Sequence, residues 1–463
     1  MQFLIISLPF IMTAFIMGFE SLFPTTNFQF SRRLRVVWPI LTLAVMVLLI
    51  WQPSATGENG SFEFSALSKL FLTLLFSLTG LALLSADTMG FLNTGRFSPV
   101  TLAVCGIVQA ALYITNPFLV TLCFVAASFF SIVAIVDLAG AREERFVKSV
   151  RSAVRYLIAS VLFGLMLFIA LIFLERLRLD PQQVGLIKVV VAMLAVGFAL
   201  RLGIFPFNLW LPEMLEEVPG LAGFLVVGLI NAAATVFLID FLQKNPALLF
   251  DNYEEAKIIM MLGLAGAVLA GILALGQNGL GKMVAYTVSS DYGLILFGLA
   301  SPHTVGKNGA LFEVANLALL QLLIFTCLGL VYYCNQGISL QGLSGLGQRM
   351  PVAAVGLAVG FLGMGGVPLL SGFTGKYLII QSAAQEGLWW ALAAGSAIAI
   401  CVVAYLRYFH SLFMGNATPG LKTRPEPRAA MALILVLVGI VILIGLWPAP
   451  ALDWMNSALK GTF

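Results

Sequence analysis

The chain alternates between long apolar runs and short polar stretches from one end to the other. A run of about 20 apolar residues is long enough to cross roughly 30 Å of hydrocarbon as an α-helix. The runs are continuous, unlike the short alternating strands of a membrane barrel, so the pattern predicts an all-α polytopic membrane protein of about fourteen transmembrane helices. The expected spans are 3–23, 35–51, 66–85, 98–115, 117–137, 152–175, 186–206, 221–242, 257–277, 282–301, 309–333, 351–385, 387–412 and 429–449.

The seventh span ends in RLGIFPFNLWLPEMLEEVP (201–219), where the apolar pattern is interrupted. Pro206, Trp210 and Pro212 form the interruption, and Arg201 lies one helical turn inside the apolar side. A cation beside broken backbone is expensive in lipid, so it faces protein or water. Broken helices build ion pathways near the bilayer midplane, so the stretch predicts ion movement, or descent from an ion-moving protein.

The twelfth span has a similar break within GMGGVPLLSGFTGK (363–376), where Pro368 interrupts the helix and Lys376 follows. Spans four to eight and nine to thirteen would then be two five-helix units, each with one break and one intramembrane cation. An odd helix count gives such units opposite orientation, which predicts an inverted-topology repeat. Alternatively, the two breaks are unrelated, because Gly and Pro are common in membrane helices. The expected division is 1–97 (three-helix segment), 98–242 (first repeat), 257–412 (second repeat) and 413–463 (C-terminal helix and tail).

Composition and charge agree with a membrane location. The 463 residues are 60% hydrophobic and 10% charged, whereas an ordinary soluble chain carries about 25% charged residues. Basic clusters lie in the loops after odd-numbered spans, which predicts that these loops are cytoplasmic and that both termini lie outside an inner membrane. The net charge of +4 reflects this bias, so the partners expected are lipid and membrane subunits and not nucleic acid. The basic residues concerned are Arg32, Arg33, Arg35, Arg142, Arg145, Lys148, Arg151, Arg407, Lys422, Arg424 and Arg428.

The chain shows no pattern for cofactor chemistry of its own. The five cysteines lie in or beside apolar spans, and the two histidines, His303 and His410, are too far apart in sequence for a metal site. There is no Gly-rich phosphate loop after a strand and no paired-cysteine motif. We therefore expect a non-catalytic subunit with no cofactors, binding no nucleotide, flavin or iron–sulfur cluster by itself.

Three motifs resemble those of one family. The stretch 201–219 resembles the seventh-helix signature of the antiporter-like, proton-translocating subunits of respiratory complex I, membrane-bound hydrogenases and Mrp-type cation/proton antiporters. GLGKMVAYTVSSDYG (279–293) is similar to their tenth-helix signature, and MGGVPLLSGFTGKYLII (364–380) to their twelfth. The resemblance implies that the chain works inside a multi-subunit membrane complex. It also implies a half-channel in each five-helix unit and a mid-membrane line of titratable residues between them.

The chain departs from the family pattern at most of the titratable positions. The fifth-helix Glu is missing from TLCFVAASFFSIV, where Ala126 or Ala127 takes its place, and the seventh-helix Lys is Arg201. Arginine stays protonated inside proteins and cannot release a proton as lysine can. Lys376 matches the family. The usual seventh-, eighth- and eleventh-helix groups are replaced by Asn208, Leu215, Asn231 and Gln321.

Other charged residues could compensate in part. Asp291 lies inside the tenth span and is expected either to pair with Lys376 or to be an interfacial acid. Asp240 and Glu313 are expected to be helix-end acids, with Glu313 a candidate for the pathway. Glu217 is a candidate cytoplasmic entrance, Glu216 a solvated loop charge, Lys282 either a pathway residue or an anchor, Arg155 a snorkelling residue and Asp137 a cap. The ion-pathway candidates are Arg201, Glu217, Lys282, Asp291, Glu313 and Lys376.

Three functions remain open from the sequence. The first is proton or sodium translocation coupled to the redox or hydration chemistry of a partner, with a degenerate first half-channel. The second is a scaffold subunit of the same kind of complex that has lost transport. The third is an autonomous transporter of a small solute, which the broken helices would allow but which the three motifs disfavour.

Overall fold

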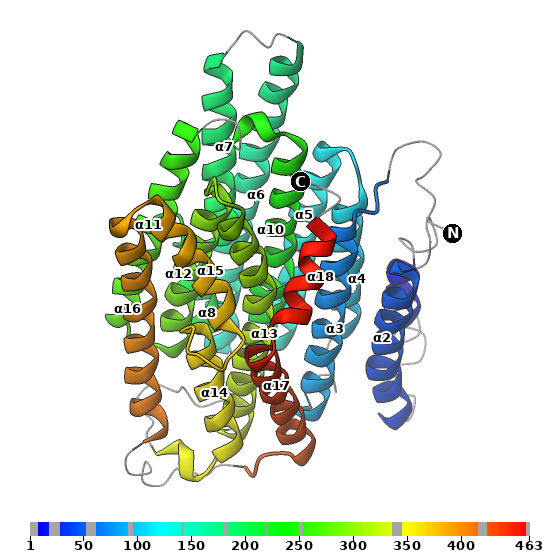
Figure 1. The fold of residues 1–463 in the computed structure, drawn as a ribbon. Helices are drawn as coiled ribbons and strands as arrows, with labels where there is room; N and C mark the ends of the chain where they lie inside the picture. Colours follow the sequence, from blue (N-terminus) through cyan, green and yellow to red (C-terminus); the bar gives the residue numbers. More distant parts are fainter. Residues whose placement is uncertain are drawn as a thin grey trace.

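The computed structural model describes residues 8–17, 28–51, 62–90, 96–139, 143–179, 184–218, 220–249, 253–335, 345–414 and 424–459, and these are almost entirely helical (Figure 1). Ten of the helices are long and apolar enough to cross a membrane, and four shorter apolar helices accompany them. The described residues contain one isolated β-bridge, between Phe62 and Ile114. The helical membrane fold predicted from the hydrophobic pattern is confirmed.

Each predicted span corresponds to one helix or to two or three consecutive helical segments. The N-terminal segment holds the helix Leu8–Met17, α2 (Phe28–Ile50) and α3 (Ala66–Thr88). Spans four to six are α4 (Phe97–Tyr113), α5 (Pro117–Ala139) and α6 (Glu143–Leu179). Span seven is α7 (Val184–Leu202) with α8 (Leu211–Glu217). Span eight begins as α9 (Gly220–Gly223) and continues through the π-helix η1 (Phe224–Ile230) into α10 (Asn231–Lys244). Spans nine to thirteen are α11 (Tyr253–Leu275), α12 (Leu280–Ala300), α13 (Thr304–Cys334), α14 (Pro351–Met364) with α15 (Gly372–Glu386), and α16 (Leu388–Phe413).

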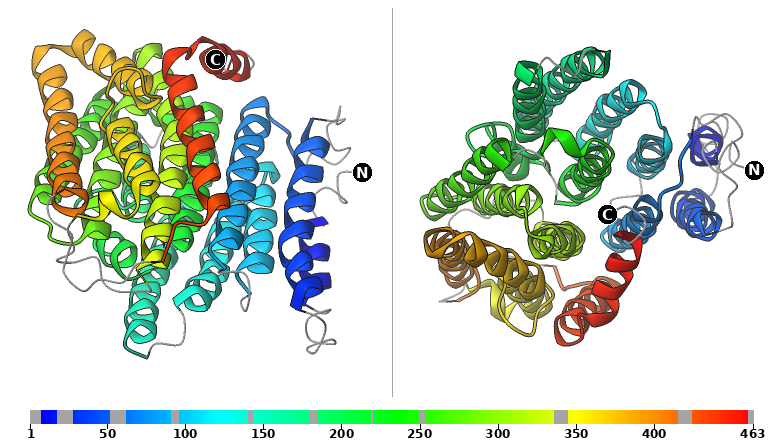
Figure 2. Two further views of the ribbon diagram at one scale, coloured as in Figure 1. Left: turned by 90° about the horizontal axis from the view of Figure 1, so that it is seen from below. Right: turned by 45° about the horizontal axis from the view of Figure 1, so that its top comes forward.

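The C-terminal part contains one helix more than predicted. Span fourteen is α17 (Arg428–Leu446), and residues expected to form a tail fold as α18 (Ala449–Leu459). Helix α18 lies against α3 and α13, and Trp454 stacks on Trp51 at the end of α2 with ring centroids 6.0 Å apart. Figure 2 shows the red C-terminal helix beside the blue N-terminal helices. The sequence did not indicate this helix, because eleven residues are too few for a span and apolar length marks only spans.

The helices differ in how much of their surface is buried. The most apolar windows of α13 and of the α9–η1–α10 segment are 94% and 100% buried, whereas those of α16 and α17 are 28% buried. Helix α13 therefore lies inside the bundle, whereas α16 and α17 expose most of their surface, and Figure 1 shows α16 at one edge. A polar side chain on the central helices must find its partner within the protein.

The loops fall into two sets on opposite ends of the bundle. At the odd-loop face, Ser149 donates to the carbonyl of Glu217, Arg155 pairs with Glu213, and the N–H of Arg424 donates to the carbonyl of Cys334. At the even-loop face, at the top of Figure 1, Lys244 pairs with Glu63 and Lys188 with Glu255. The structure thus groups the odd-numbered loops at one face, as the alternation of spans requires.

Both predicted breaks are present and have the same backbone pattern. Gly203 and Gly366 each follow the last helical turn with a positive φ of 68°. The next residue then donates its N–H five residues back: Ile204 to Ala199 at 2.9 Å and Val367 to Leu362 at 3.0 Å. This is a Schellman ending, in which glycine adopts the left-handed conformation without the strain of a Cβ. The matched endings support the proposed repeat.

The two cations are not matched in the same way. Arg201 lies two residues before Gly203, in the last turn of α7, whereas Lys376 lies after Gly366, in the second turn of α15. One buried cation does lie beside each break, as expected, but Arg201 belongs to the helix entering its break and Lys376 to the helix leaving it.

Candidate functional site: a buried lysine between two carboxylates

Three charged side chains meet in the second half of the molecule. Lys376 forms an ion pair and a hydrogen bond with Asp291 of α12, and its Nζ lies 3.3 Å from Oε1 of Glu313 on α13. The three side chains are only 3%, 4% and 1% exposed, respectively. A buried ammonium group flanked by two carboxylates is thus built from three different helices.

The cluster lies near the middle of α12, one of the helices long and apolar enough to cross a membrane. Asp291 is about 16 Å of helix from the start of α12 at Leu280 and about 14 Å from its end at Ala300. Lys376 is about 15 Å of helix below Glu386, where α15 reaches the even-loop face. At this depth lipid cannot solvate the charges, so the protein supplies their partners.

The break in the twelfth span shapes the space for Lys376. A Cβ on Gly366 would lie 2.9 Å from Cδ of Lys376, so the lysine stem runs against bare backbone in the break. On the other side, Asn316 donates to Oε2 of Glu313 at 3.3 Å. Oδ2 of Asp291 has no hydrogen-bond partner among the described residues. The cluster therefore keeps unused acceptor capacity in a buried place.

The structure corrects our reading of Glu313 as a helix-end acid. Helix α13 begins at Thr304, five residues before the predicted span, so Glu313 lies in its third turn and not at the interface. The first turns of α13 include the polar residues Lys307 and Asn308, so the apolar pattern placed the start of the helix too late in the sequence. Asp240 does lie at a helix end, 18% exposed and paired with Lys244 at 2.7 Å.

Arg201 has a different environment in the first half. Its side chain is 1% exposed, and Nη1 donates to the hydroxyls of Ser128 at 2.6 Å and Ser160 at 3.0 Å. Tyr156 also donates to Ser128, at 3.0 Å. The Nε and Nη2 atoms of Arg201 have no hydrogen-bond partner in the described ranges. Arg201 is thus bound by hydroxyls, where Lys376 is bound by carboxylates.

Aromatic rings supply the remaining stabilisation of Arg201. Its Cζ lies 5.6 Å from the ring centre of Tyr156 and 5.9 Å from that of Phe163. Each contact of this kind is worth roughly 0.5–2 kcal/mol, more when desolvated. Sequence reasoning missed Ser128, Ser160 and Tyr156 as partners. Ser128 directly follows Ala127, the position at which we looked for an acid, and a serine in an apolar helix gives no charge signal.

The break in the seventh span connects the two halves. Asn208 donates to Ser289 at 3.3 Å, two residues before Asp291 on α12. Trp210 donates its indole N–H to the carbonyl of Leu200 at 2.8 Å and so satisfies a backbone group freed by the break. Pro206 lies within the break and Pro212 near the start of α8, as the sequence predicted, while Pro368 lies in the second break. These residues have a structural role that keeps α7 and α8 in place.

Between the two cations lies a polar but non-ionic region. Tyr292 donates to the carbonyl of Val227 in η1 at 3.2 Å, and Asn231 follows directly after this π-helix. The side chains of Asn231 and Gln321 are buried and have no hydrogen-bond partner among the residues that the structure describes. π-helical turns are frequent at functional sites. The resemblance predicted titratable groups at these positions, whereas amides cannot carry a proton charge near neutral pH.

At the odd-loop face one of two neighbouring acids, Glu216, differs from our expectation, while the role expected of the Glu217 side chain stays a prediction. Glu216, expected to be a solvated loop charge, accepts the N–H of Lys282 at 3.1 Å and so receives the start of α12. Glu217 contributes its backbone carbonyl, which accepts from Ser149 at 3.0 Å. Arg155 pairs with Glu213, and Asp137 accepts the N–H of Phe97 at 2.9 Å, as a cap of α4. Helix α8 packs against α12, so Glu216 reaches the start of α12, which the sequence could not show.

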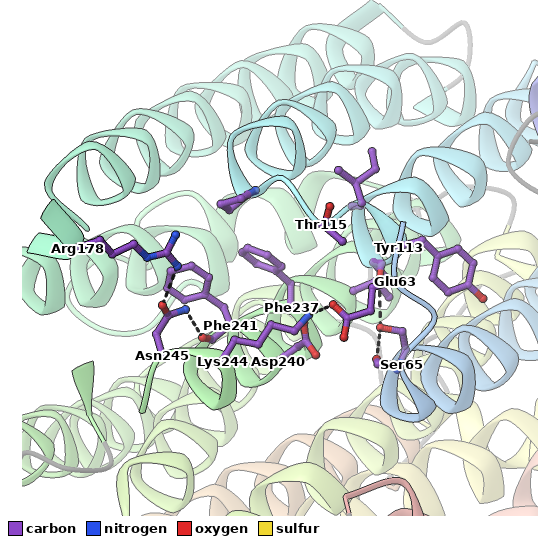
Figure 3. Close-up of a pocket in the computed structure, with 15 residues that line it drawn as sticks. Glu63, Ser65, Tyr113, Thr115, Arg178, Phe237, Asp240, Phe241, Lys244 and Asn245 are labelled. Atoms are coloured by element: carbon purple, nitrogen blue, oxygen red, sulfur yellow. Dashed lines mark hydrogen bonds and ion pairs between the residues drawn. The ribbon is translucent and has the colours of Figure 1, made fainter. Parts of the chain in front are cut away.

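A pocket of about 140 Å³ opens at the even-loop face of the first half (Figure 3). Lys244 bridges the two carboxylates of Glu63 and Asp240, each at 2.7 Å, and Arg178 donates to Asn245 at 3.2 Å. The β-bridge of Phe62 and Ile114 holds the segment of Glu63 beside the end of α4. These ion pairs hold charged side chains in the wall of the pocket at this end of the first half.

Comparison with known proteins agrees with this architecture. Residues 116–401 match the family described as "NADH:quinone oxidoreductase/Mrp antiporter, TM". The chain is 28% identical over 280 residues to NADH-quinone oxidoreductase subunit N from Chromohalobacter salexigens, a match that covers 58% of this chain and 57% of that relative. The match thus spans less than two thirds of the relative's length.

Two solved structures have the same fold over almost the whole chain. One is a chain of the Mrp complex from Dietzia sp., with a TM-score of 0.82 and 18% identity, covering 99% of this chain and 97% of that one. The other is a chain of respiratory complex I from Thermus thermophilus, with a TM-score of 0.79 and 20% identity, covering 100% and 99%. With the broken helices and the family match, these similarities show that the chain belongs to the NADH:quinone oxidoreductase/Mrp antiporter family of membrane subunits.

Proposed function

We propose that the chain translocates protons through its second half only, as a non-catalytic subunit of a complex I-related membrane assembly. The observation that carries this proposal is the buried cluster of Lys376, Asp291 and Glu313 near mid-membrane. One ammonium and two carboxylates leave one negative charge in excess. A buried net charge is costly, so the cluster becomes neutral when it binds one proton. Uptake and release of that proton is the elementary step of translocation.

Among the described residues of the first half, no buried lysine lies between carboxylates in this way; Lys244, between Glu63 and Asp240, is partly exposed at the even-loop face. Arginine cannot exchange its proton, and the hydroxyls of Ser128 and Ser160 do not neutralise Arg201. A fixed positive charge in a pathway repels cations, as it does in selective pores. We therefore infer that the first half is closed to protons and to sodium, and that Arg201 forms the barrier.

The scaffold function remains the second candidate. It is favoured by the environment of Arg201 together with the unpaired amides of Asn231 and Gln321, because these interrupt a mid-membrane line between the halves. In that case the Lys376 cluster would only hold α12, α13 and α15 together. Partner subunits are expected under both functions, since the similar chains belong to an Mrp complex and to respiratory complex I. We further propose that the odd-loop face is cytoplasmic and that both termini lie outside.

The test is proton translocation by the complete native complex in proteoliposomes, measured per catalytic turnover of the complex with an interior pH dye. Lys376→Gln should lower the number of protons per turnover, and Arg201→Gln should leave it unchanged. Lys188, which is 73% exposed, provides the control Lys188→Gln. The content of each variant chain in the purified complex is measured in parallel.

The outcomes separate the candidates. Fewer protons per turnover with Lys376→Gln, but not with Arg201→Gln, supports transport through the second half. If neither variant changes the number of protons, the chain is a scaffold. If Arg201→Gln lowers it as strongly as Lys376→Gln, the first half is not closed. Repeating the assay without sodium distinguishes proton from sodium transport.

A further inference from the structure

A second group of titratable side chains lies above the Lys376 cluster at the even-loop face. His303, at the start of α13, places Nε2 3.1 Å from Oε1 of Glu386, the last residue of α15. Tyr253, the first residue of α11, donates to Oε2 of the same carboxylate at 2.9 Å. Three helices thus end at one carboxylate.

The exposure of this group is graded. The side chain of Glu386 is 8% exposed and that of His303 is 35% exposed, while Tyr253 is exposed. Glu254 lies beside Tyr253 on α11, and Lys307 lies one turn into α13. The imidazole is therefore reached by water, while the carboxylate that would pair with its charged form is sheltered. Histidine is the side chain that changes charge between pH 5 and 8.

A buried pair of hydroxyls lies between this group and the cluster. Ser301 and Ser382 are fully buried, their oxygens are 2.7 Å apart, and either can be the donor. Ser301 also accepts the N–H of His303 at 3.2 Å. Along α15, Ser382 lies about 9 Å above Lys376 and about 6 Å below Glu386. The helix thus carries polar groups at three depths between mid-membrane and the surface.

We propose that His303, paired with Glu386, is the group that passes protons between the second half and water at the even-loop face. The neutral imidazole accepts a proton from the inner side and becomes an imidazolium that Glu386 stabilises. It then gives the proton to water, so one proton has moved and His303 and Glu386 are unchanged. The segment between Lys376 and Ser382 holds buried Ile379, so water or side-chain movement must complete the path there. This inference rests on the proposed function of the second half.

The test uses the same complex in proteoliposomes, with proton translocation measured from pH 5 to 8 on the even-loop side. His303→Gln should lower the rate about a hundredfold, the lower end of the range for lost acid–base catalysis, and make the rate less dependent on pH. Glu386→Gln should also lower the rate, because the imidazolium then loses the carboxylate that lies 3.1 Å from its Nε2. His410, the second histidine, lies exposed in the last turn of α16, so His410→Gln is the matched control and should behave as the unmodified chain.

Chemical rescue separates proton transfer from a structural role. His303→Ala leaves space at a water-accessible position, and free imidazole added on the even-loop side should restore the rate. If His303→Ala assembles normally and loses translocation, and imidazole does not restore the rate, the proposal is overturned. If Lys376→Gln stops translocation while His303→Gln changes neither rate nor pH profile, only this inference fails. If Lys376→Gln has no effect, the proposed function fails and this inference with it.

Discussion

At the scale of residues, the two intramembrane cations show how surroundings decide what a charge can do. Lys376 has two carboxylates and can take part in proton exchange, because the cluster can gain or lose a proton without leaving a large buried charge. Arg201 has hydroxyls and rings. Its charge is permanent, so its neighbours can only stabilise it.

The hydroxyl of Ser128 should be important for this stabilisation. Ser128→Ala removes the acceptor of both Arg201 and Tyr156. Arg201 then keeps only Ser160, and weakening the hydrogen bonding of a buried charged donor costs about 1–3 kcal/mol, so the free energy of unfolding should fall by about that amount. The measurement is SDS-induced unfolding of the purified chain in mixed micelles.

The matched control is Ser131→Ala on the same helix. Ser131 is also buried, but it donates only to the carbonyl of Ser128 in its own helix. Ser131→Ala should lower the free energy of unfolding clearly less than Ser128→Ala. Equal losses for the two variants would show that the Arg201 contacts add nothing beyond local helix geometry.

At the scale of elements, the breaks in the seventh and twelfth spans organise both halves. The motifs predicted where each break lies, because Pro and Gly mark interrupted helices in the sequence itself. What each break contacts was not predictable, since it depends on helices distant in the chain. Asn208 reaches Ser289 on α12, and Gly366 provides the wall for Lys376.

Gly366 should not tolerate a side chain. At a φ of +68°, a Cβ costs about 1–2 kcal/mol, and this one would also lie 2.9 Å from Cδ of Lys376. Gly366→Ala should therefore lower the free energy of unfolding by at least that amount and also reduce proton translocation. Thermal unfolding and the proteoliposome assay check the two effects.

Gly395 offers a control for this substitution. It lies within α16, and a Cβ there would meet nothing within 4 Å. Gly395→Ala should stabilise the helix by roughly 0.5–1 kcal/mol and leave translocation unchanged. A Gly366→Ala variant as stable as Gly395→Ala would contradict the strained geometry of the break.

At the scale of the whole molecule, the basic loops predict one orientation in the membrane. In the proposed orientation Arg151 faces the cytoplasm and Glu254 the outside, and both are exposed. Arg151→Cys should then be labelled by an impermeant thiol reagent only in inverted vesicles, and Glu254→Cys only in intact cells. Four of the five native cysteines are buried, so background labelling should be low. The reverse pattern would place both termini inside.

The sequence by itself determined the class of fold, the approximate spans, the two breaks and the family. Each of these depends on local features: apolar length, Pro and Gly, and short motifs. Only the tertiary structure decided which charges meet. It placed Lys376 between Asp291 and Glu313 and surrounded Arg201 with Ser128 and Ser160. The physical reason is that burial makes a partner obligatory for a charge, while the partner's identity depends on helices packed together from distant parts of the chain.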